Sequence, residues 1–319
     1  MESLNVFASR LVTKREYFAR GHRACQGCAE ALAVRLVAKA LGSNVVVASA
    51  TGCMEIVSSP FPFTNWNVPW IHVAFENAAA VITGAESGVK ALVRKGKLPD
   101  KGTVFLGMGG DGATSDIGLQ ALSGAFERGH KFVYVCYDNE AYMNTGIQRS
   151  SATPLGAATS TCPAGDQIPG KTQYHKDMTR IMAAHRIPYV AQASPSHWSD
   201  LIEKVQKALS KDGPSFINII SPCHRGWRYA MEDTIEMARL AVETCYWPLY
   251  ECDEGTWRIT YTPKEKLPLT EWTGKQGRFA HLKDRPDVLA QGQAEADRRW
   301  QELQALSGIG NLCKPPEKG

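Results

Sequence analysis

The stretch GMGGDG, residues Gly107–Gly112, directly follows the apolar run Val104 to Gly107. Glycines at the carboxyl end of a strand let backbone N–H groups approach a phosphate, and the N-terminus of a following helix adds a favourable partial charge. Asp111 then offers a hard oxygen ligand for a Mg²⁺ ion that bridges diphosphate oxygens. The alternative is a tight turn between strand and helix in which Asp111 caps the helix, and this short motif alone favours that alternative.

A second polar motif follows the next apolar run along the chain. Residues Asp138–Asn144 read DNEAYMN, and Asn139 stands 28 residues after Asp111. If the two runs form neighbouring parallel strands, both motifs lie at one edge of the sheet, where Asn139 offers a second oxygen to the same ion. The pair is much stronger evidence for a diphosphate and Mg²⁺ site than either motif alone.

This pairing resembles the thiamine-diphosphate motif, in which Gly-Asp-Gly is followed at such a distance by Asn. The resemblance implies that Mg²⁺ is held by Asp111, by the Asn139 side chain and by the backbone carbonyl of Ala141. The motif often has a second Asn where this chain has Glu140. The other residues that it places beside the diphosphate are Gly110, Gly112, Ala113 and Asn144.

The rest of the chain alternates apolar runs with helix-like stretches, which predicts an α/β fold with a doubly wound, mostly parallel sheet. The predicted strands are Val45 to Ser49, Val104 to Gly107, Phe132 to Tyr137, Tyr189 to Ala191 and Phe216 to Ile220. The predicted helices are Cys28 to Leu41, Asp116 to Arg128, Lys176 to His185, Ser196 to Ser210 and a polar helix near Asp287 to Leu306.

Two segments depart from this alternation. Residues 154–171 are rich in Gly, Pro, Ser and Thr, which predicts a long functional loop near the ligand. After about Pro248 the composition changes, so we expect a cofactor-binding domain over 1–247 and a C-terminal arm or subdomain over 248–319. The arm either packs on partner subunits or folds back on its own core.

Composition excludes several classes of protein. The chain has 319 residues, 21% of them charged, and a formal net charge of +4, which gives little support to nucleic-acid binding. It lacks a secretory start and a long uninterrupted apolar run, so we expect no membrane span and a cytoplasmic location. Nine cysteines in a reducing compartment indicate metal ligation or buried thiols rather than disulfides.

Four of these cysteines form a second constellation. Cys25 and Cys28 make a C-x-x-C turn, and Cys53 and Cys223 each lie just beyond a predicted strand. All four can therefore converge at the carboxyl edge of one sheet. Four thiolates suit either a structural Zn²⁺ or a [4Fe-4S] cluster. Zinc sites usually combine two C-x-x-C knuckles, so one knuckle with two remote cysteines favours the cluster.

Longer runs carry a more specific resemblance. Residues 21–28 (GHRACQGC), 50–55 (ATGCME), 116–118 (DIG) and 137–150 (YDNEAYMNTGIQRS) look like the β subunit of pyruvate:ferredoxin oxidoreductase, in the 2-oxoacid:ferredoxin oxidoreductase family. The similarity runs from about Arg15 to Trp247, and Gln276–Phe279 also fits. The resemblance implies that Glu30 and Cys53 neighbour the thiazolium ring. The resemblance also implies that the cluster ligands are Cys25, Cys28, Cys53 and Cys223.

The resemblance also implies an activity and a set of partners. The activity is coenzyme A-dependent oxidative decarboxylation of pyruvate with electron transfer to ferredoxin. The partners are an α subunit, which supplies the carboxylate that activates the aminopyrimidine and residues that bind the substrate, and γ and δ subunits. Oxalate or a branched-chain 2-oxoacid is the alternative substrate, and a zinc-stapled scaffold without catalytic activity is the remote alternative.

Overall fold

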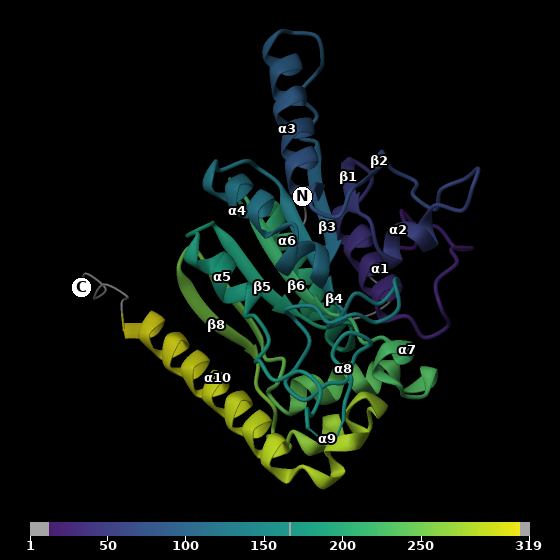
Figure 1. Cartoon of the computed structure of the whole chain (residues 1–319). Coiled ribbons are helices and arrows are strands. Elements are labelled where there is room, and N and C mark those ends of the chain that lie inside the picture. The colour runs from purple at the N-terminus through teal and green to yellow at the C-terminus, as the bar shows by residue number, and fades with distance from the viewer. Residues whose placement is uncertain (1–12, 166, 313–319) are drawn as a thin grey trace.

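The computed structural model describes residues 13–165 and 167–312, which contain one sheet of eight strands (Figure 1). The strands are β1 (Val45–Ala50), β2 (Trp70–Val73), β3 (Val104–Gly110), β4 (Val133–Asp138), β5 (Tyr189–Ala193), β6 (Ser215–Ile220), β7 (Leu249–Asp253) and β8 (Thr256–Tyr261). Their order across the sheet is β2-β1-β3-β4-β6-β5-β7-β8. All pairings from β2 across to β5 are parallel, whereas β7 and β8 pair antiparallel at one side.

Helices cover both faces of this sheet. On one face lie α1 (Ala29–Leu41) and α6 (Trp198–Ser210), and on the other lie α3 (Ala78–Arg94), α4 (Leu119–Glu127) and α5 (Met178–Ala184). This arrangement confirms the predicted doubly wound α/β fold. The remaining α-helices are α2 (Cys53–Ser58), α7 (His224–Trp227), α8 (Thr234–Glu243), α9 (Thr270–Thr273) and α10 (Pro286–Leu312).

The central strand β4 shows why the sheet is covered on both faces. All six of its residues are buried, as expected of a parallel strand between two helical layers. Val133, Val135 and Tyr137 pack in the core beneath α1 and α6. Tyr134 and Cys136 pack in the core beneath α3, α4 and α5. Cys136 is therefore a small buried apolar side chain, as we expect from its place within a strand.

The C-terminal segment contributes to the same sheet. Strands β7 and β8 extend it beyond β5, and α10 runs along β8 toward the C-terminal end of the described chain (Figure 1). Part of the segment thus folds back on the chain's own core. The division at residue 247 and the docking of 248–319 on partner subunits stay predictions. Across the described residues, no helix combines the length and apolar character needed to cross a membrane.

Candidate cofactor site

One pocket at the carboxyl edge of the parallel strands brings most of the predicted cofactor-binding residues together. Its walls come from the ends of β1, β3 and β4 and from the segments that follow them. Because β1, β3 and β4 are neighbours in the sheet, motifs far apart in sequence meet here. The predicted residues that line it are Cys53, Gly110, Asp111, Gly112, Ala113, Asn139, Ala141 and Asn144.

Asp111 is a buried carboxylate that forms no ion pair with a described side chain. Its side chain is 1% exposed, Oδ2 accepts a hydrogen bond of 2.5 Å from Ser150 Oγ, and Oδ1 has no partner. Burial raises the pKa of Asp111 to about 8, since the charged form loses its hydration. A divalent cation at Oδ1 would supply the missing partner and stabilise the charge, so Asp111 fits the Mg²⁺ ligand expected from the sequence.

Asn139 and Glu30 form the second polar pair of the site. Asn139 Nδ2 donates a hydrogen bond to Glu30 Oε1, while Asn139 Oδ1 accepts one of 3.2 Å from the backbone N–H of Ala141. Glu30, in the first turn of α1, is 3% exposed and its Oε2 has no partner. Burial raises the pKa of Glu30 to about 7. The structure thus places Glu30 behind Asn139 and beside the pocket.

Gly112 must be glycine because the side chain of Tyr142 packs against it. A Cβ at this position would lie 2.2 Å from Cε1 of Tyr142, a distance that real structures do not allow. Tyr142 in turn bonds through its hydroxyl to Asp116 Oδ2 over 3.3 Å. The glycine therefore lets the loop after β3 pack directly against the loop after β4. The sequence motif alone does not reveal this contact.

A segment after the second motif, Ser150–Thr153, ties the two loops together. Ser150 Oγ holds Asp111, and Thr153 Oγ1 donates a hydrogen bond of 2.7 Å to the carbonyl oxygen of Glu140. Lys171, only 1% exposed, donates to the carbonyl oxygens of Ser150, Ser151 and Thr153. Lys171 is the last residue of the predicted long loop, so this end of the loop contacts the segment that holds Asp111, and the functional role of the loop stays a prediction. Sequence reasoning did not single out Lys171.

The C-x-x-C turn is held against the C-terminal part of the chain. Cys28 is the N-cap of α1, and its N–H donates a hydrogen bond of 3.2 Å to Cys25 O. Gly27 has a φ of 73°, and a Cβ there would lie 2.4 Å from the carbonyl oxygen of Met231. Thr234 Oγ1 donates to Gly27 O over 2.7 Å. The turn therefore requires glycine between the two cysteines and close packing from the start of α8.

The four predicted cluster thiols are neighbours. The pKa of Cys53 is raised, first by burial and then by the nearby charges of Glu30 and of the Cys223, Cys28 and Cys25 thiols. Burial also raises the pKa of Cys28 to about 12 and that of Cys223 to about 11. Within the described residues, no three His, Cys, Asp or Glu side chains are grouped tightly enough to hold a single metal ion.

Cys53 belongs to both constellations. It lines the pocket with Asp111 and Asn139, and its thiol is near the other three cysteines. Cys223 is the N-cap of α7 and accepts a hydrogen bond of 3.4 Å from the N–H of Gly226. Cys53 follows β1, Cys223 follows β6, and Cys25 and Cys28 directly precede α1, so one end of the sheet carries both sets of residues.

Comparison with known proteins agrees with this geometry. Residues 50–219 match the family model of the C-terminal TPP-binding domain of thiamine pyrophosphate enzymes. The 2-oxoglutarate:ferredoxin oxidoreductase structure from Magnetococcus marinus covers 70% of this chain and 79% of its own, with a TM-score of 0.51 and 21% identity, which shows a shared fold. Fold and site together define a thiamine pyrophosphate enzyme domain.

Full-length relatives define the family more closely. Pyruvate synthase subunit PorB of Methanocaldococcus jannaschii is 56% identical over 85% of this chain and 91% of its own length. PorB of Thermotoga maritima is 50% identical over 91% and 92%, and ketoisovalerate oxidoreductase subunit VorB of Pyrococcus horikoshii is 45% identical over 92% and 94%. This chain belongs to the PorB family of pyruvate synthase subunits, within the 2-oxoacid:ferredoxin oxidoreductases, as the sequence motifs predict.

Proposed function

We propose that this chain is the subunit of a pyruvate:ferredoxin oxidoreductase complex that binds thiamine diphosphate, Mg²⁺ and a [4Fe-4S] cluster. The complex would perform coenzyme A-dependent oxidative decarboxylation of pyruvate and pass the electrons to ferredoxin. The observation that carries the proposal is the single pocket lined by Asp111, Asn139 and Cys53. This pocket brings a carboxylate, an amide and a thiol side chain together at one carboxyl edge of the sheet, which supports a shared site for a metal ion and a cluster.

The donor set at this edge suits Mg²⁺ and a diphosphate. Asp111 offers an oxygen without a partner, Asn139 offers an amide oxygen, and Ala141 offers a backbone carbonyl, all hard ligands that Mg²⁺ accepts. The backbone of Gly110 to Ala113 lines the same pocket, and Asn144 lies exposed at its rim. When bound, thiamine diphosphate would supply the carbon nucleophile that the chain's own side chains lack.

The cysteine set suits a cluster better than a mononuclear site. A tetrahedral Zn²⁺ needs four sulfurs drawn to one point, whereas an iron-sulfur cube holds its four thiolates farther apart. The chain has one C-x-x-C knuckle and two remote cysteines rather than two knuckles, which favours the cluster, and the four thiols are close enough for their charges to raise the pKa of Cys53. Cluster iron would keep the thiolates deprotonated against the burial that raises the pKa of Cys28 and Cys223. The zinc-stapled scaffold is the alternative that metal analysis would separate.

The proposed partners supply the groups that this chain's part of the cofactor site lacks. The family relatives are named as subunits, and the resemblance places the pyrimidine-activating carboxylate on an α subunit. We therefore propose an α subunit over the pocket, γ and δ subunits in the same complex, and coenzyme A, 2-oxoacid and ferredoxin as reactants. The proposed location is the cytoplasm, as expected from nine cysteines that suit metal ligation or burial better than disulfides.

A second candidate substrate, a branched-chain 2-oxoacid, also has support. The VorB relative, a ketoisovalerate oxidoreductase subunit, is 45% identical over 92% of this chain. Pyruvate remains the proposed substrate because the PorB relatives are more similar, at 56% and 50% identity. The same cofactor half-site would serve either substrate.

Anoxic purification of the chain, alone and with its co-eluting subunits, tests the proposal. We expect the complex to contain iron and sulfide and to reduce ferredoxin or viologen with pyruvate and coenzyme A, faster than with ketoisovalerate. The lone chain should bind thiamine diphosphate weakly and show no turnover, because half a site supplies only part of the binding energy. Stoichiometric zinc, or pyruvate-dependent dye reduction by the lone chain, would contradict the assignment.

A further inference from the structure

Glu140 stands between the two proposed metal ligands Asn139 and Ala141 and has an unusual backbone. Its φ is 68°, in the left-handed region that residues other than glycine rarely adopt. The residue is 1% exposed. Such a conformation persists only where the surroundings determine it, and it often marks functional sites. The orientation of both neighbouring ligand groups therefore depends on what holds Glu140.

Two side chains from the C-terminal half hold its carboxylate. Arg278 donates to Glu140 Oε2 over 2.5 Å, and the Tyr246 hydroxyl donates to Oε1 over 2.6 Å. Arg278 is itself 3% exposed, and its Nε donates to Gln276 Oε1 over 2.8 Å. A buried guanidinium with this many fixed partners acts as a rigid planar group rather than as a point charge.

Arg278 also reaches the preceding ligand, Asn139, through an indole. Its guanidinium lies 4.0 Å from the ring centroid of Trp227, and Trp227 Nε1 donates a hydrogen bond of 2.8 Å to the carbonyl oxygen of Asn139. One arginine is thus joined to Glu140 directly and to Asn139 through Trp227. Trp227 closes α7, which begins directly after Cys223, so the contact links the metal-directed loop to a proposed cluster ligand.

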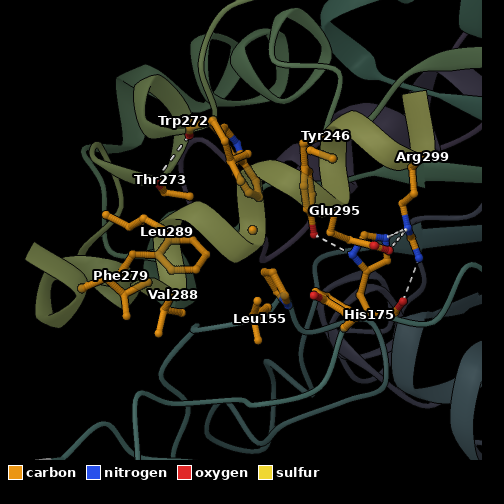
Figure 2. A pocket seen from close by; sticks show the side chains of 16 residues that line it. Leu155, His175, Tyr246, Trp272, Thr273, Phe279, Val288, Leu289, Glu295 and Arg299 are labelled. Atoms are coloured by element: carbon orange, nitrogen blue, oxygen red, sulfur yellow. Dashed lines mark hydrogen bonds and ion pairs between the residues drawn. The ribbon is translucent and has the colours of Figure 1, made fainter. Parts of the chain in front are cut away.

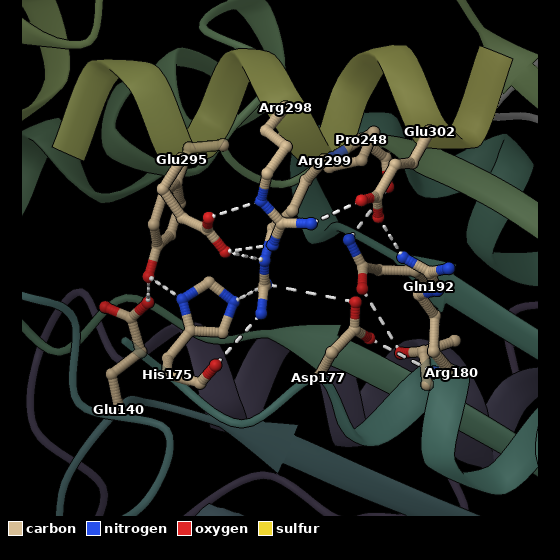
Figure 3. A network of polar contacts seen from close by, with 12 residues as sticks. Glu140, His175, Asp177, Arg180, Gln192, Pro248, Glu295, Arg298, Arg299 and Glu302 are labelled. Atoms are coloured by element: carbon tan, nitrogen blue, oxygen red, sulfur yellow. Dashed lines mark hydrogen bonds and ion pairs between the residues drawn. The ribbon is translucent and has the colours of Figure 1, made fainter. Parts of the chain in front are cut away.

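A second chain of contacts connects Glu140 to α10. Tyr246 OH lies 3.2 Å from His175 Nδ1, and Arg299 on α10 bonds to the His175 ring and, over 2.9 Å, to its carbonyl oxygen. Figure 3 shows Glu140, His175 and Arg299 in this order beneath the helix. The apolar pocket beside them is walled by Trp272 and residues of α10 (Figure 2), and Tyr246, which also lines it, bonds to Glu140.

We propose that Arg278 is a positioning residue for the thiamine-diphosphate and Mg²⁺ site. It fixes the loop Asp138–Ala141 through Glu140 and Trp227, so that the Asn139 side chain and the Ala141 carbonyl face the ion together. The inference rests on the proposed function, since it assumes that this loop binds Mg²⁺. Arg278 touches neither the ion nor the substrate, and it acts only through the two residues that it holds.

The test uses the purified complex with its partner subunits and measures Mg²⁺-dependent binding of thiamine diphosphate by calorimetry. In Arg278→Lys, an ammonium can still pair with Glu140 but cannot lie flat on the indole or reach Gln276 at the same time. We expect the Mg²⁺ affinity to fall by roughly 10- to 100-fold, the range found when partners of metal ligands are lost. Arg278→Met should lose more, so that lysine restores part of the function.

The matched control is Arg258→Lys, which alters another arginine bonded to a buried glutamate, Glu251, away from the pocket. It should leave cofactor binding unchanged. If wild-type complex binds no thiamine diphosphate, the proposed function itself fails. If wild type binds it and Arg278→Lys binds Mg²⁺ and cofactor equally well, or loses no more than Arg258→Lys, the positioning role is overturned. A lower melting temperature with unchanged affinity would likewise show a purely structural ion pair.

Discussion

Two buried carboxylates, one at the pocket and one at the side of the sheet, have opposite surroundings. Asp111 and Glu251 are 1% and 2% exposed. The Asp111 carboxylate accepts a side-chain hydrogen bond from the neutral Ser150, and burial raises its pKa to about 8. Glu251 is also desolvated, but hydrogen bonds from Lys207, Tyr189 and Arg258 outweigh the burial and lower its pKa.

The difference separates a carboxylate that the chain itself neutralises from one that we propose binds a metal ion. Glu251 is neutralised by the chain's own cations, so it needs nothing from outside. Asp111 forms no ion pair with a described side chain, although the buried Lys171 amine is near enough for the two charges to interact. A divalent cation at the unpartnered Oδ1 would stabilise the Asp111 charge directly. The same contrast applies to Glu30, whose pKa burial raises to about 7. Asp111 and Glu30 are therefore two buried acids with raised pKa values at the proposed cofactor edge.

The largest effect should come from Asp111→Ala. Because the change removes an oxygen ligand rather than a core side chain, we expect loss of Mg²⁺-dependent thiamine-diphosphate binding by at least roughly 100-fold. Iron content should stay nearly intact. Equilibrium dialysis for the cofactor and iron analysis on the same preparation would check both expectations. Cofactor occupancy equal to that of wild type would refute the role given to Asp111.

Cys53→Ser should have the next largest effect, because Cys53 lies in the pocket and beside the other thiols. A hard serine hydroxyl replaces a thiolate poorly at iron, so we expect reduced iron content, an altered cluster spectrum and slowed electron transfer to ferredoxin. Electron paramagnetic resonance of the anoxic, reduced protein measures this. The control, Cys252→Ala on β7, lies far from the pocket and should keep the cluster. A full cluster signal with normal activity in Cys53→Ser would remove Cys53 from the ligand set.

The main site could be predicted because the two strands that carry its motifs, β3 and β4, follow each other in sequence and are neighbours in the sheet. β3 and β4 pair directly, so the loops that carry Asp111 and Asn139 had to meet. The five predicted strands all exist, with ends that differ by no more than three residues. Periodicity and β-branched content suffice for such buried strands.

The sequence reading missed other elements for physical reasons. Helix α3 carries Gly84 and Gly88, which weaken the helical pattern, and its formation depends on burying Ala78, Ala79 and Ile82 against the sheet. The β7–β8 hairpin did have a local signal, the turn at Glu254 and Gly255, where φ is 48° and 83°. Alternating residues on both sides of that turn could have revealed the hairpin.

The support around Glu140 could not be predicted from the sequence. Arg278 is 138 residues away along the chain, and only the folded C-terminal segment brings it to Glu140. No local pattern encodes a contact of that kind. The position of β6 between β4 and β5 could not be predicted either. It reverses the sequence order of β5 and β6, and the residue patterns of these two strands are alike. Residues that bind could be read from motifs, whereas residues that position them could not.

The smallest expected effect tests the structural side of the comparison, through Glu251→Gln. The free energy of unfolding should fall by about 1 to 2 kcal/mol, because a neutral amide bonds less strongly to Lys207 and Arg258, while thiamine-diphosphate binding stays unchanged. The folded pKa of Glu251 lies below its ordinary 4.5, so its stabilisation is present above that pH and is lost as the pH falls through the folded pKa. Denaturant unfolding of wild type and variant between about pH 7 and about pH 4 should therefore show the stability difference shrinking at the acid end. A difference that grows toward low pH, or a loss of cofactor binding in this variant, would contradict the separation between the two carboxylates.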